Sequence, residues 1–551
     1  MKEISILIGG KAGDGIRQAG QTLARLLNRI GFRIFFYDDY PSLIRGGHNF
    51  SIIRASEKKI LAHKEKVDLI VALNQDAVEK HKNRLNSGGL ILYDSKKVEA
   101  QEGVGIDFMD LVKKLEGAPI MRNTAALGAL AKVLNIDWPI LENVIKDTFE
   151  KEVDLNLKIA KSGYNQIKKA YFSVSHSNQK MLPLVSGNEA IALGAVQAGL
   201  NMYIAYPMTP ASAILHYLAE HEDDLGVVTV HPESEIGVVL MALGAAYAGA
   251  RTMVGTSGGG FALMTEALSL SGQGELPIVF VVSQRPGPST GVPTYTMQGD
   301  LSFVIHAGHG EFAKLVLAPG DAEEAFYLTG LAMNLAWRFQ IPCFVLSDKH
   351  LSESIFSFDG DPDKVKPEVP LLLDGQGEYK RYLDTPNGIS PLAFPGNAAP
   401  MIKATSYEHD EYGITTEESE QIARMQKKRL RKKKTMEHDL ARYEQVKVYG
   451  NPDSKTVLLC WGSTKGACIE AAEELGLKVV QPLVLEPLPV ESLKKALSGA
   501  DKIIDIEVNA TGQLSKLLSA HGICIDDMIL RFDARPFTVD FLLEKIEEVL
   551  S

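Results

Sequence analysis

The feature of this sequence that most constrains its fold is a run of six short apolar segments, alternating with helical patterns, between residues 202 and 347. Short apolar segments separated by helices are typical of a parallel sheet with helices on both faces. We therefore expect a doubly wound parallel sheet, with a helix in every gap except the one that holds the Gly/Pro-rich loop after Ser283. The expected strands are 202–205, 226–230, 251–256, 276–283, 313–318 and 341–347.

The same alternation continues on both sides of this run. Strands are expected at 4–8, 33–37, 68–73 and 88–93 on one side, and at 455–462, 478–485 and 502–509 on the other. At about 150 residues per domain, 551 residues allow three or four domains. The sequence thus predicts an α/β protein with three α/β domains, at 1–175, 186–360 and 451–551, and a Pro-rich and charged connector at 361–450.

The composition places the chain among soluble globular proteins, with 45% hydrophobic and 23% charged residues. Its net charge of −11 excludes the overall basic field that nucleic-acid binding uses. The longest apolar run, 237–250, is too short to span a bilayer. We expect a cytoplasmic protein with neither nucleic acid nor a membrane among its partners.

The four cysteines, Cys343, Cys460, Cys468 and Cys524, are scattered along the chain, and no CxxC pair occurs. A disulfide framework or an iron–sulfur site needs several cysteines at suitable spacings. Because Cys343 and Cys460 lie inside apolar segments, we expect the cysteines to act as small buried apolar residues. We expect no metal and no cluster on this chain.

The connector contains an acidic stretch around 408–420, followed by eight basic residues within 424–434. Thr415 and Glu418 have the spacing of a capping box, which predicts that a helix begins there. The basic run could bind nucleic acid or an anionic partner. Since the acidic stretch lies beside it, we favour a solvated helix that joins two domains.

Residues 9–15, GGKAGDG, form a glycine-rich segment between the first expected strand and the first helix. Glycines here let a phosphate approach the backbone N–H groups, or let the strand and helix pack closely. The spacing matches neither GxGxxG nor a Walker A loop. A Gly-Asp-Gly also begins the diphosphate motif of thiamine diphosphate enzymes, but the paired Asn of that motif is absent, since 38–46 read DDYPSLIRG.

Four consecutive strands of the central sheet end in loops that could carry chemistry. After the first comes YPMTP (206–210), where Thr209 suits an N-cap and Pro210 the first helical position. This segment is either a helix start or a ligand site at the carboxyl end of a parallel strand. After the second comes Glu235, which opens a helix rich in small residues. Glu235 either complements the helix dipole or is a desolvated acid that bonds a heterocycle.

The next two strands end in TSGGG (256–260) and QRPGPSTG (284–291), where Arg285 is the only strong cation of these loops. Arginine is the residue best shaped to hold a carboxylate through two hydrogen bonds. Any one of these loops could be simple turn chemistry. Four in series at one sheet edge predict a binding site.

In this order, YPMTP, the ESE of 233–235, GTSGGG (255–260) and QRPGPSTGVPT (284–294) resemble the alpha subunit of 2-oxoacid:ferredoxin oxidoreductases. The N-terminal GGKAGDGI (9–16), IRGGHNF (44–50) and MRNTAALGAL (121–130) resemble the gamma subunit of that family, fused in front. WGST (461–464), EVNATGQL (507–514) and ARPFT (534–538) are similar to the last domain of the alpha subunit. The resemblance covers essentially the whole chain. It implies a thiamine-diphosphate pyrimidine-binding central domain and a transketolase-C-terminal-like last domain.

The resemblance implies roles for individual residues. Glu235 corresponds to the catalytic glutamate that bonds N1′ of thiamine diphosphate, and so favours the imino tautomer that removes the C2 proton. Thr209 and Arg285 correspond to the residues that bind the 2-oxoacid and its carboxylate. The cofactor-binding residues implied are Glu235, Tyr206, Pro207 and Ser257.

The family implies that this chain is half of a catalytic site. The reaction is the coenzyme A-dependent oxidative decarboxylation of a 2-oxoacid, with electrons passed to ferredoxin. Thiamine diphosphate is shared with a separate beta subunit, which carries Mg²⁺ and the iron–sulfur cluster. The connector, YEHDEYG to KKRLRKKK (407–434), resembles the 2-oxoglutarate type. Met208 and Ala211 depart from the family pattern beside the substrate, so pyruvate and branched-chain 2-oxoacids stay as alternatives.

A different class of function also uses glycine-rich strand ends. A nucleotide- or electron-carrier-binding α/β scaffold without catalysis would carry such loops. It would not require Glu235 together with Arg285, and this pair therefore favours the enzyme subunit.

Overall fold

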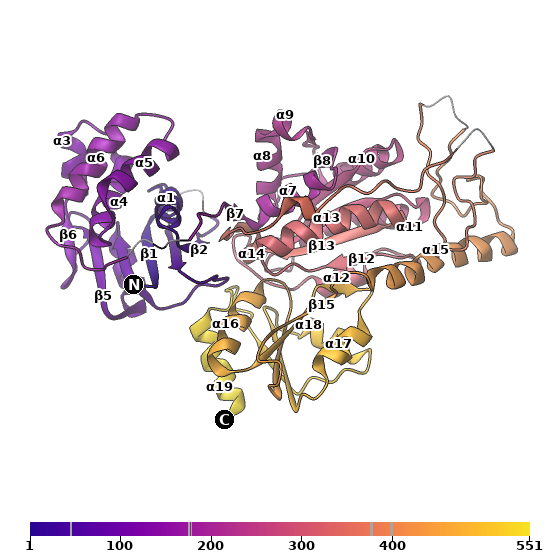
Figure 1. Ribbon diagram of the computed structural model, residues 1–551. Helices are drawn as coiled ribbons and strands as arrows, with labels where there is room; N and C mark the ends of the chain where they lie inside the picture. Colours follow the sequence, from indigo (N-terminus) through magenta and orange to yellow (C-terminus); the bar gives the residue numbers. More distant parts are fainter. Residues whose placement is uncertain (44–46, 175–176, 178, 375–377, 397–400) are drawn as a thin grey trace. The chain divides into compact units, whose positions relative to one another are not determined.

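The computed structural model describes residues 1–43, 47–174, 177, 179–374, 378–396 and 401–551 (Figure 1). The chain forms two compact units, Met1–Val185 with Glu353–Asp359 and Phe537–Ser551, and Ser186–Ser352 with Gly360–Pro536. Residues 44–46 of the 44–50 motif, and 175 at the end of the first expected domain, lie outside the described residues. No helix in the described parts of the chain is long and apolar enough to cross a bilayer.

The first unit is built on a mixed sheet with the strand order β6-β5-β4-β1-β3-β2-β14-β7 (Figure 1). The four expected strands are confirmed as β1, β2, β4 and β5. The first of them continues through Gly9 and Gly10, so half of the expected glycine loop is strand. Strand β3, which pairs with β1 in antiparallel orientation, was not predicted. The strands are β1 (Glu3–Lys11), β2 (Arg33–Asp39), β3 (His48–Ser56), β4 (Val67–Ala72), β5 (Leu85–Asp94), β6 (Val104–Ile106), β7 (Leu184–Ser186) and β14 (Ile355–Ser357).

Six α-helices and two short 3₁₀ turns between residues 16 and 166 accompany this sheet, and the C-terminal helix α19 (Val539–Leu550) belongs to the same unit. The face of α1 that carries Leu23, Leu26 and Leu27 is fully buried, as its apolar spacing predicts. The elements are α1 (Ile16–Arg29), α2 (Gln75–His81), η1 (Lys82–Arg84), α3 (Phe108–Lys114), η2 (Pro119–Met121), α4 (Arg122–Val133), α5 (Trp138–Thr148) and α6 (Val153–Gln166).

The central sheet of the second unit has the order β18-β12-β13-β11-β10-β8-β9, and all six predicted strands are confirmed in it. Neighbours from β9 to β12 are parallel, as expected for a doubly wound sheet. The gap after Ser283 was expected to lack a helix, which is wrong, because a short helix, α12, follows the loop. The strands are β8 (Met202–Ile204), β9 (Val228–Val230), β10 (Thr252–Thr256), β11 (Ile278–Gln284), β12 (Leu315–Leu317) and β13 (Pro342–Asp348).

Helices cover both faces of the central sheet (Figure 1). Small residues let two of them, α10 and α11, pack together, with Gly260 against the side chain of Glu235. The helices are α7 (Gly187–Gln197), α8 (Ser212–Glu220), α9 (Glu222–Leu225), α10 (Glu235–Tyr247), α11 (Gly258–Gly274), α12 (Leu301–His306), α13 (Ala322–Phe339) and α14 (Lys349–Glu353), followed by the 3₁₀ turn η3 (Pro362–Lys364).

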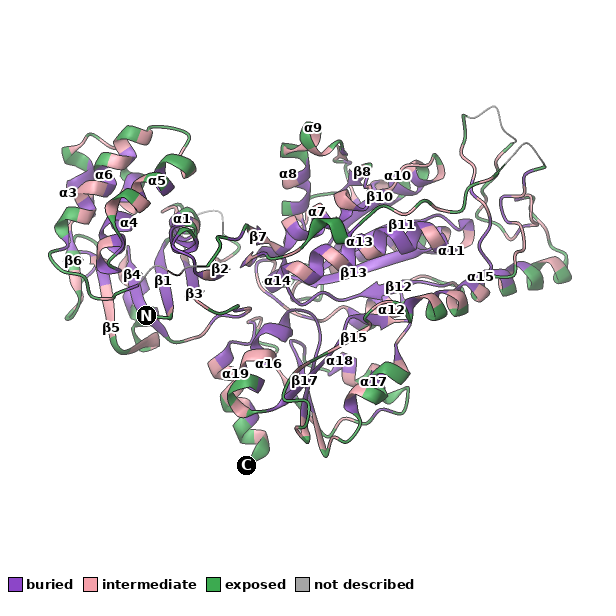
Figure 2. Cartoon of the chain, in the orientation of Figure 1, coloured by how far each residue is buried: buried purple, intermediate pink, exposed green. Residues whose placement is uncertain are grey.

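The C-terminal sheet of the second unit has the order β15-β17-β16-β19-β20, and all but β15 are parallel. The segment expected as one strand at 478–485 forms two, and the second, β18, joins the central sheet beside β12. One core therefore contains Phe280 and Phe344 of the central sheet together with Trp461. Figure 2 shows the central strands in purple, the colour of buried residues. The elements are β15 (Val446–Gly450), β16 (Thr456–Cys460), η4 (Gly462–Thr464), α16 (Lys465–Leu475), β17 (Lys478–Pro482), β18 (Val484–Glu486), α17 (Val490–Leu497), β19 (Lys502–Glu507), α18 (Gln513–Ser519) and β20 (Asp527–Leu530).

The basic run lies on the long helix α15 (Ser419–Leu440), and two expectations for it are wrong. The Thr415–Glu418 capping box does not form, because the helix begins at Ser419 and Glu418 caps it without a side-chain hydrogen bond. The helix is also not simply solvated, since Lys428 and Lys432 are buried against the carboxylate of Glu275. The sequence order hides this pairing, because Glu275 lies about 150 residues before its partners.

The cluster of Glu275 and its partners is a fully buried ion-pair network. Burial would raise the pKa of Glu275, but Lys428, Lys432 and Arg381 outweigh it and hold that pKa below its usual value. Burial lowers the pKa of Lys432 to about 7 despite the nearby carboxylate. The connector is therefore fixed to the second unit by charges that can be satisfied only when the helix is docked.

Glu275→Gln should destabilise the second unit by roughly 3–5 kcal/mol, because it leaves two lysines buried beside a neutral amide. Denaturant unfolding of the chain, followed by circular dichroism, measures the change. Glu417→Gln removes an exposed carboxylate just before α15 and is the matched control. Equal unfolding midpoints for the two variants would contradict a role for this network in stability.

The expectation of buried cysteines is confirmed for three of the four and is wrong for Cys524. Cys343, Cys460 and Cys468 are buried, and Cys524 is exposed. Burial raises the pKa of Cys343 and Cys468, which keeps both thiols protonated and unreactive. Among the described residues, no group of three or more His, Cys, Asp or Glu side chains is placed to hold a metal ion.

Candidate functional site

The four strand-end loops meet at one edge of the central sheet. Their strands, β9, β8, β10 and β11, are neighbours and parallel, so their carboxyl ends lie side by side. The chain runs from β8 to one side, into β9, and then crosses to the other side, into β10. Ligands of open α/β sheets bind in the crevice where the strand order reverses in this way. The expected common edge of the four loops is confirmed, and the switch point, at which such a crevice is expected, lies between β8 and β10.

Glu235 is the first residue of α10 and is 4% exposed. Its Oε1 atom is buried without a hydrogen-bond partner among the described residues. The N-cap bond of the helix comes from Ser234, whose hydroxyl accepts from the N–H of Gly237. Since a buried unpaired carboxylate oxygen is costly, this atom is suited to bond a donor that arrives with a ligand.

Gly260, in the first turn of α11, makes room for this carboxylate. A Cβ atom at residue 260 would lie 2.7 Å from Oε1 of Glu235 and 2.1 Å from Oγ1 of Thr256, closer than any side chain permits. Close packing at residue 260 thus explains why the 255–260 motif needs glycine there. This packing brings β10, Glu235 and the start of α11 together at the crevice.

Arg285 and Thr209 lie together, as their positions at one sheet edge predict. Nη1 of Arg285 donates to the main-chain carbonyl of Thr209, at 2.7 Å. Of the two interpretations of this segment, the helix start at Thr209 and Pro210 does not form, because α8 begins at Ser212. Both Thr209 and Arg285 are half-buried.

The other expected site residues line the same edge. Tyr206 and Pro207 follow β8 and are exposed, and the Tyr206 ring lies edge-on to His231 after β9, with 5.9 Å between centroids. Ser257 is buried at the N-cap of α11, where its side chain makes no capping bond. Oγ1 of Thr256 lies 3.8 Å from the sulfur of Met208, the residue that departs from the family pattern.

Sequence reasoning missed the residues that fix the loop after Arg285. Gln298 bonds across to the C-terminal sheet: its Nε2 donates to the carbonyl of Trp461, and its Oε1 accepts from the N–H of Val508. Nε2 of Gln513 donates to the carbonyl of Gly299. Two of the C-terminal motifs, 461–464 and 507–514, therefore hold the loop that carries Arg285. In the sequence, the QGD segment at 298–300, which ends this loop, could have pointed to these residues.

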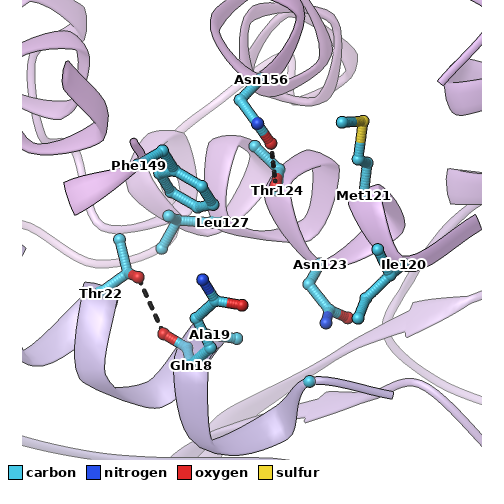
Figure 3. Close-up of a pocket in the computed structure, with 11 residues that line it drawn as sticks. Gln18, Ala19, Thr22, Ile120, Met121, Asn123, Thr124, Leu127, Phe149 and Asn156 are labelled. Atoms are coloured by element: carbon cyan, nitrogen blue, oxygen red, sulfur yellow. Dashed lines mark hydrogen bonds between the residues drawn. The ribbon is translucent and has the colours of Figure 1, made fainter. Parts of the chain in front are cut away.

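The first unit has a separate cavity of about 180 Å³ between α1 and α4 (Figure 3). Polar side chains of Gln18, Asn123 and Thr124 line it, and Thr124 donates to Asn156 at 2.9 Å. Oδ1 of Asn123 is buried without a partner among the described residues. None of its lining residues is charged, so it holds no acid–base pair and no cation for a carboxylate.

Beside this cavity, packing accounts for the glycine-rich segment at 9–15. A Cβ atom would lie 2.8 Å from Ala77 at residue 9, 2.6 Å from Ile16 at residue 10 and 2.7 Å from Asn123 at residue 15. Asp14 pairs with Arg122, which fixes the turn to α4. The close-packing interpretation of these glycines is supported by contacts at three positions.

Comparisons with known proteins agree with this arrangement. Residues 193–428 match the family described as "pyruvate flavodoxin/ferredoxin oxidoreductase, thiamine diP-bdg", and residues 5–166 match the family described as "pyruvate ferredoxin/flavodoxin oxidoreductase". The first match covers all four strand-end loops. The second lies within the first unit.

Similar proteins match over nearly the full length. Subunit alpha of 2-oxoacid:ferredoxin oxidoreductase 2 from Aeropyrum pernix is 32% identical, over 97% of this chain and 96% of its own. Subunit alpha of the Saccharolobus solfataricus 2-oxoacid:ferredoxin oxidoreductase is 31% identical, over 100% of this chain and 98% of its own. The structure of 2-oxoglutarate:ferredoxin oxidoreductase from Magnetococcus marinus, with 2-oxoglutarate, coenzyme A and succinyl-CoA bound, has a TM-score of 0.92 at 31% identity and covers 100% of both chains. The chain therefore belongs to the alpha-subunit family of the 2-oxoacid:ferredoxin oxidoreductases.

Proposed function

We propose that this chain is the alpha subunit, with a fused gamma-type domain, of an enzyme that oxidatively decarboxylates a 2-oxoacid to its acyl-coenzyme A and CO₂ and passes the electrons to ferredoxin. The observation that carries the proposal is the buried, unpartnered carboxylate oxygen of Glu235 at the crevice between β8 and β10. A scaffold that only cradles a nucleotide has no use for such a group.

The residues at this crevice fit the aminopyrimidine half of thiamine diphosphate. Oε1 of Glu235 would accept a hydrogen bond from the protonated ring nitrogen, which satisfies the buried oxygen. Tyr206, Pro207 and Ser257 would border the ring from the ends of β8 and β10. When bound, thiamine diphosphate supplies the nucleophilic carbon that attacks the keto group. Glu235 would hold the proton that the ring needs in order to activate that carbon.

Arg285 and Thr209 would bind the substrate. The guanidinium of Arg285, already anchored on the carbonyl of Thr209, would hold the carboxylate of the 2-oxoacid through charge-assisted hydrogen bonds. The hydroxyl of Thr209 would make a neutral contact beside it. We favour 2-oxoglutarate, because the similar structure from Magnetococcus marinus contains it and the connector resembles that type. Pyruvate and branched-chain 2-oxoacids are the alternatives, since Met208 lies beside the site.

A beta subunit would complete the site. Ile236, Leu240 and Met241 on α10 and Leu263 on α11 are 44–52% exposed, and a Cβ atom at Gly244 would meet nothing within 4 Å. Residues 236, 240 and 244 share one face of the helix. An apolar and glycine-lined face beside the crevice suits a partner that packs closely. We assign to that partner the diphosphate and Mg²⁺ half of the cofactor site, the iron–sulfur cluster and the contact with ferredoxin.

The chain purified without its partner should show neither turnover nor the visible absorbance of an iron–sulfur cluster, because its four cysteines are scattered. Adding the beta subunit should restore thiamine-dependent reduction of ferredoxin. Steady-state kinetics of the complex with 2-oxoglutarate, pyruvate and 2-oxoisovalerate then test the substrate. Cluster absorbance in the isolated chain, or turnover by it, would overturn this division of labour. A higher kcat/KM for pyruvate would overturn the preference for 2-oxoglutarate.

A further inference from the structure

Asn188, in the first turn of α7, is a polar residue that was not among the expected site residues. Its side chain is buried, at 1% exposure, and its Nδ2 donates to the carbonyl of Pro210, at 2.9 Å. Pro210 is itself buried, and it directly follows Thr209, the residue proposed to contact the substrate. The start of α7 is therefore bonded to the loop that follows β8.

The residues around Asn188 in SGNE (186–189) fix the start of this helix. Ser186 and Glu189 form a capping box: the N–H of Glu189 donates to Oγ of Ser186, at 3.2 Å, and the N–H of Ser186 donates to Oε2 of Glu189, at 2.7 Å. Gly187 packs against the chain that follows β13, since a Cβ atom there would lie 2.1 Å from the carbonyl oxygen of Leu351. Asn188 is thus held at a defined place, from which its side chain extends to the loop after β8.

Three consecutive carbonyls of that loop each accept a hydrogen bond. The carbonyl of Met208 accepts from the first N–H of α8, at 3.1 Å. The carbonyl of Thr209 accepts from Nη1 of Arg285, at 2.7 Å, and that of Pro210 accepts from Asn188. Because a buried carbonyl that loses its donor costs free energy, each bond constrains the path of the backbone. The backbone on both sides of Thr209 is therefore fixed, which limits the positions that its hydroxyl can take.

We propose that Asn188 is a positioning residue for the 2-oxoacid: by holding the carbonyl of Pro210, it keeps the hydroxyl of Thr209 beside the substrate carboxylate. This inference rests on the proposed function of Thr209 and Arg285. Arg285 holds the neighbouring carbonyl, but its other donors must also serve the substrate. Asn188 is a second anchor, which keeps the loop in place whether or not substrate is bound.

The first test compares Asn188→Leu with wild type in steady-state kinetics of the alpha–beta complex. Leucine is similar in size but has no N–H group to give to Pro210. The KM for the 2-oxoacid should rise about tenfold, because the carbonyl left without a donor lets the loop shift. The kcat and the KM for coenzyme A should hardly change, since Asn188 acts on substrate binding alone.

An unchanged oxoacid KM in Asn188→Leu overturns the proposal. A lowered kcat with that KM unchanged would mean a merely structural residue, and overturns it as well. If the leucine variant does not assemble, Asn188→Ala removes the same donor without adding bulk, and it should raise the same KM.

Asn28→Leu is the matched control. Asn28, on α1 in the first unit, is 6% exposed, and its Nδ2 donates to the carbonyl of Leu182, at 2.8 Å. In both Asn28 and Asn188, Oδ1 is buried without a hydrogen-bond partner in the part of the chain that the structure describes. The two substitutions thus remove the same kind of bond at similar burial, and only the one at 188 should raise the oxoacid KM. An equal rise in both variants overturns the proposal.

The second test is a double-mutant cycle with Thr209→Val. If Asn188 acts through Thr209, the double variant should have an oxoacid KM close to that of Thr209→Val, because the hydroxyl that Asn188 positions is already absent. Effects that multiply overturn the inference. The cycle also separates the two levels: an unchanged KM in Thr209→Val defeats the proposed function of that residue, whereas a raised KM there with a wild-type KM in Asn188→Leu defeats only this inference.

Discussion

Glu235→Gln should lower the kcat of the alpha–beta complex by about 10²–10⁴-fold while leaving assembly intact, because the amide cannot hold the proton that the cofactor ring requires. The carboxylate is buried, unpartnered and set against glycine at 260, so the near-isosteric amide fits the same space. The expected loss is therefore chemical. Single-turnover kinetics with the 2-oxoacid, without coenzyme A, would place it at decarboxylation.

Glu233→Gln is the matched control for this variant. Glu233 precedes the same helix by two residues, but its carboxylate is exposed beside Gly237. It should leave turnover unchanged. If Glu235 only complemented the helix dipole, its replacement would cost about 0.3–1 kcal/mol of stability and no chemistry. Near-wild-type turnover by Glu235→Gln would thus contradict the assignment.

Arg285→Ala should raise the KM for the 2-oxoacid by about 30-fold to a few thousand-fold, the equivalent of roughly 2–5 kcal/mol for an unpaired carboxylate. The residue is half-buried and its Nη1 is committed to the carbonyl of Thr209. Its remaining donors are therefore the ones available to a substrate. Steady-state kinetics with the 2-oxoacid and with coenzyme A as varied substrates measure the two effects separately.

Thr209→Val serves as the comparison, since it removes a neutral contact in the same loop. It should cost less, roughly 1–3 kcal/mol. The KM for coenzyme A should hardly change in either variant. If Arg285→Ala raised that KM and left the oxoacid KM unchanged, the roles assigned to the two ligands would have to be exchanged.

Much of the fold could be predicted because the strands of parallel sheets carry a strong local signal. All six expected strands of the central sheet form, since each is a short apolar segment between helices. The four loops then meet because parallel strands end at one edge. For β3, HNFSIIRAS mixes polar and apolar residues without a clear alternation, and no strand was predicted.

The errors arose where distant contacts override local propensity. Thr209 and Pro210 look like a helix start, yet the helix begins at Ser212. The basic run looks solvated, yet Glu275 draws Lys428 and Lys432 into the interior. Neither outcome is encoded in the neighbouring residues.

The loop from Arg285 to Asp300 illustrates the same limit within the site. Its Gly/Pro composition predicts a turn, but its path depends on Gln298 and Gln513, which bond across some 200 residues of sequence. The local sequence therefore marked Arg285 and missed Gln298 and Gln513, which fix the loop that carries it.

The exchange rate of the C2 proton of thiamine diphosphate in the assembled complex is the most direct test of the assignment of Glu235. It needs neither substrate nor ferredoxin, and it is followed by NMR after dilution into D₂O and an acid quench. The complex with wild-type alpha chain should exchange this proton about 10²–10⁴-fold faster than the complex with Glu235→Gln. Equal exchange rates in the two complexes would contradict the claim that this chain activates the cofactor.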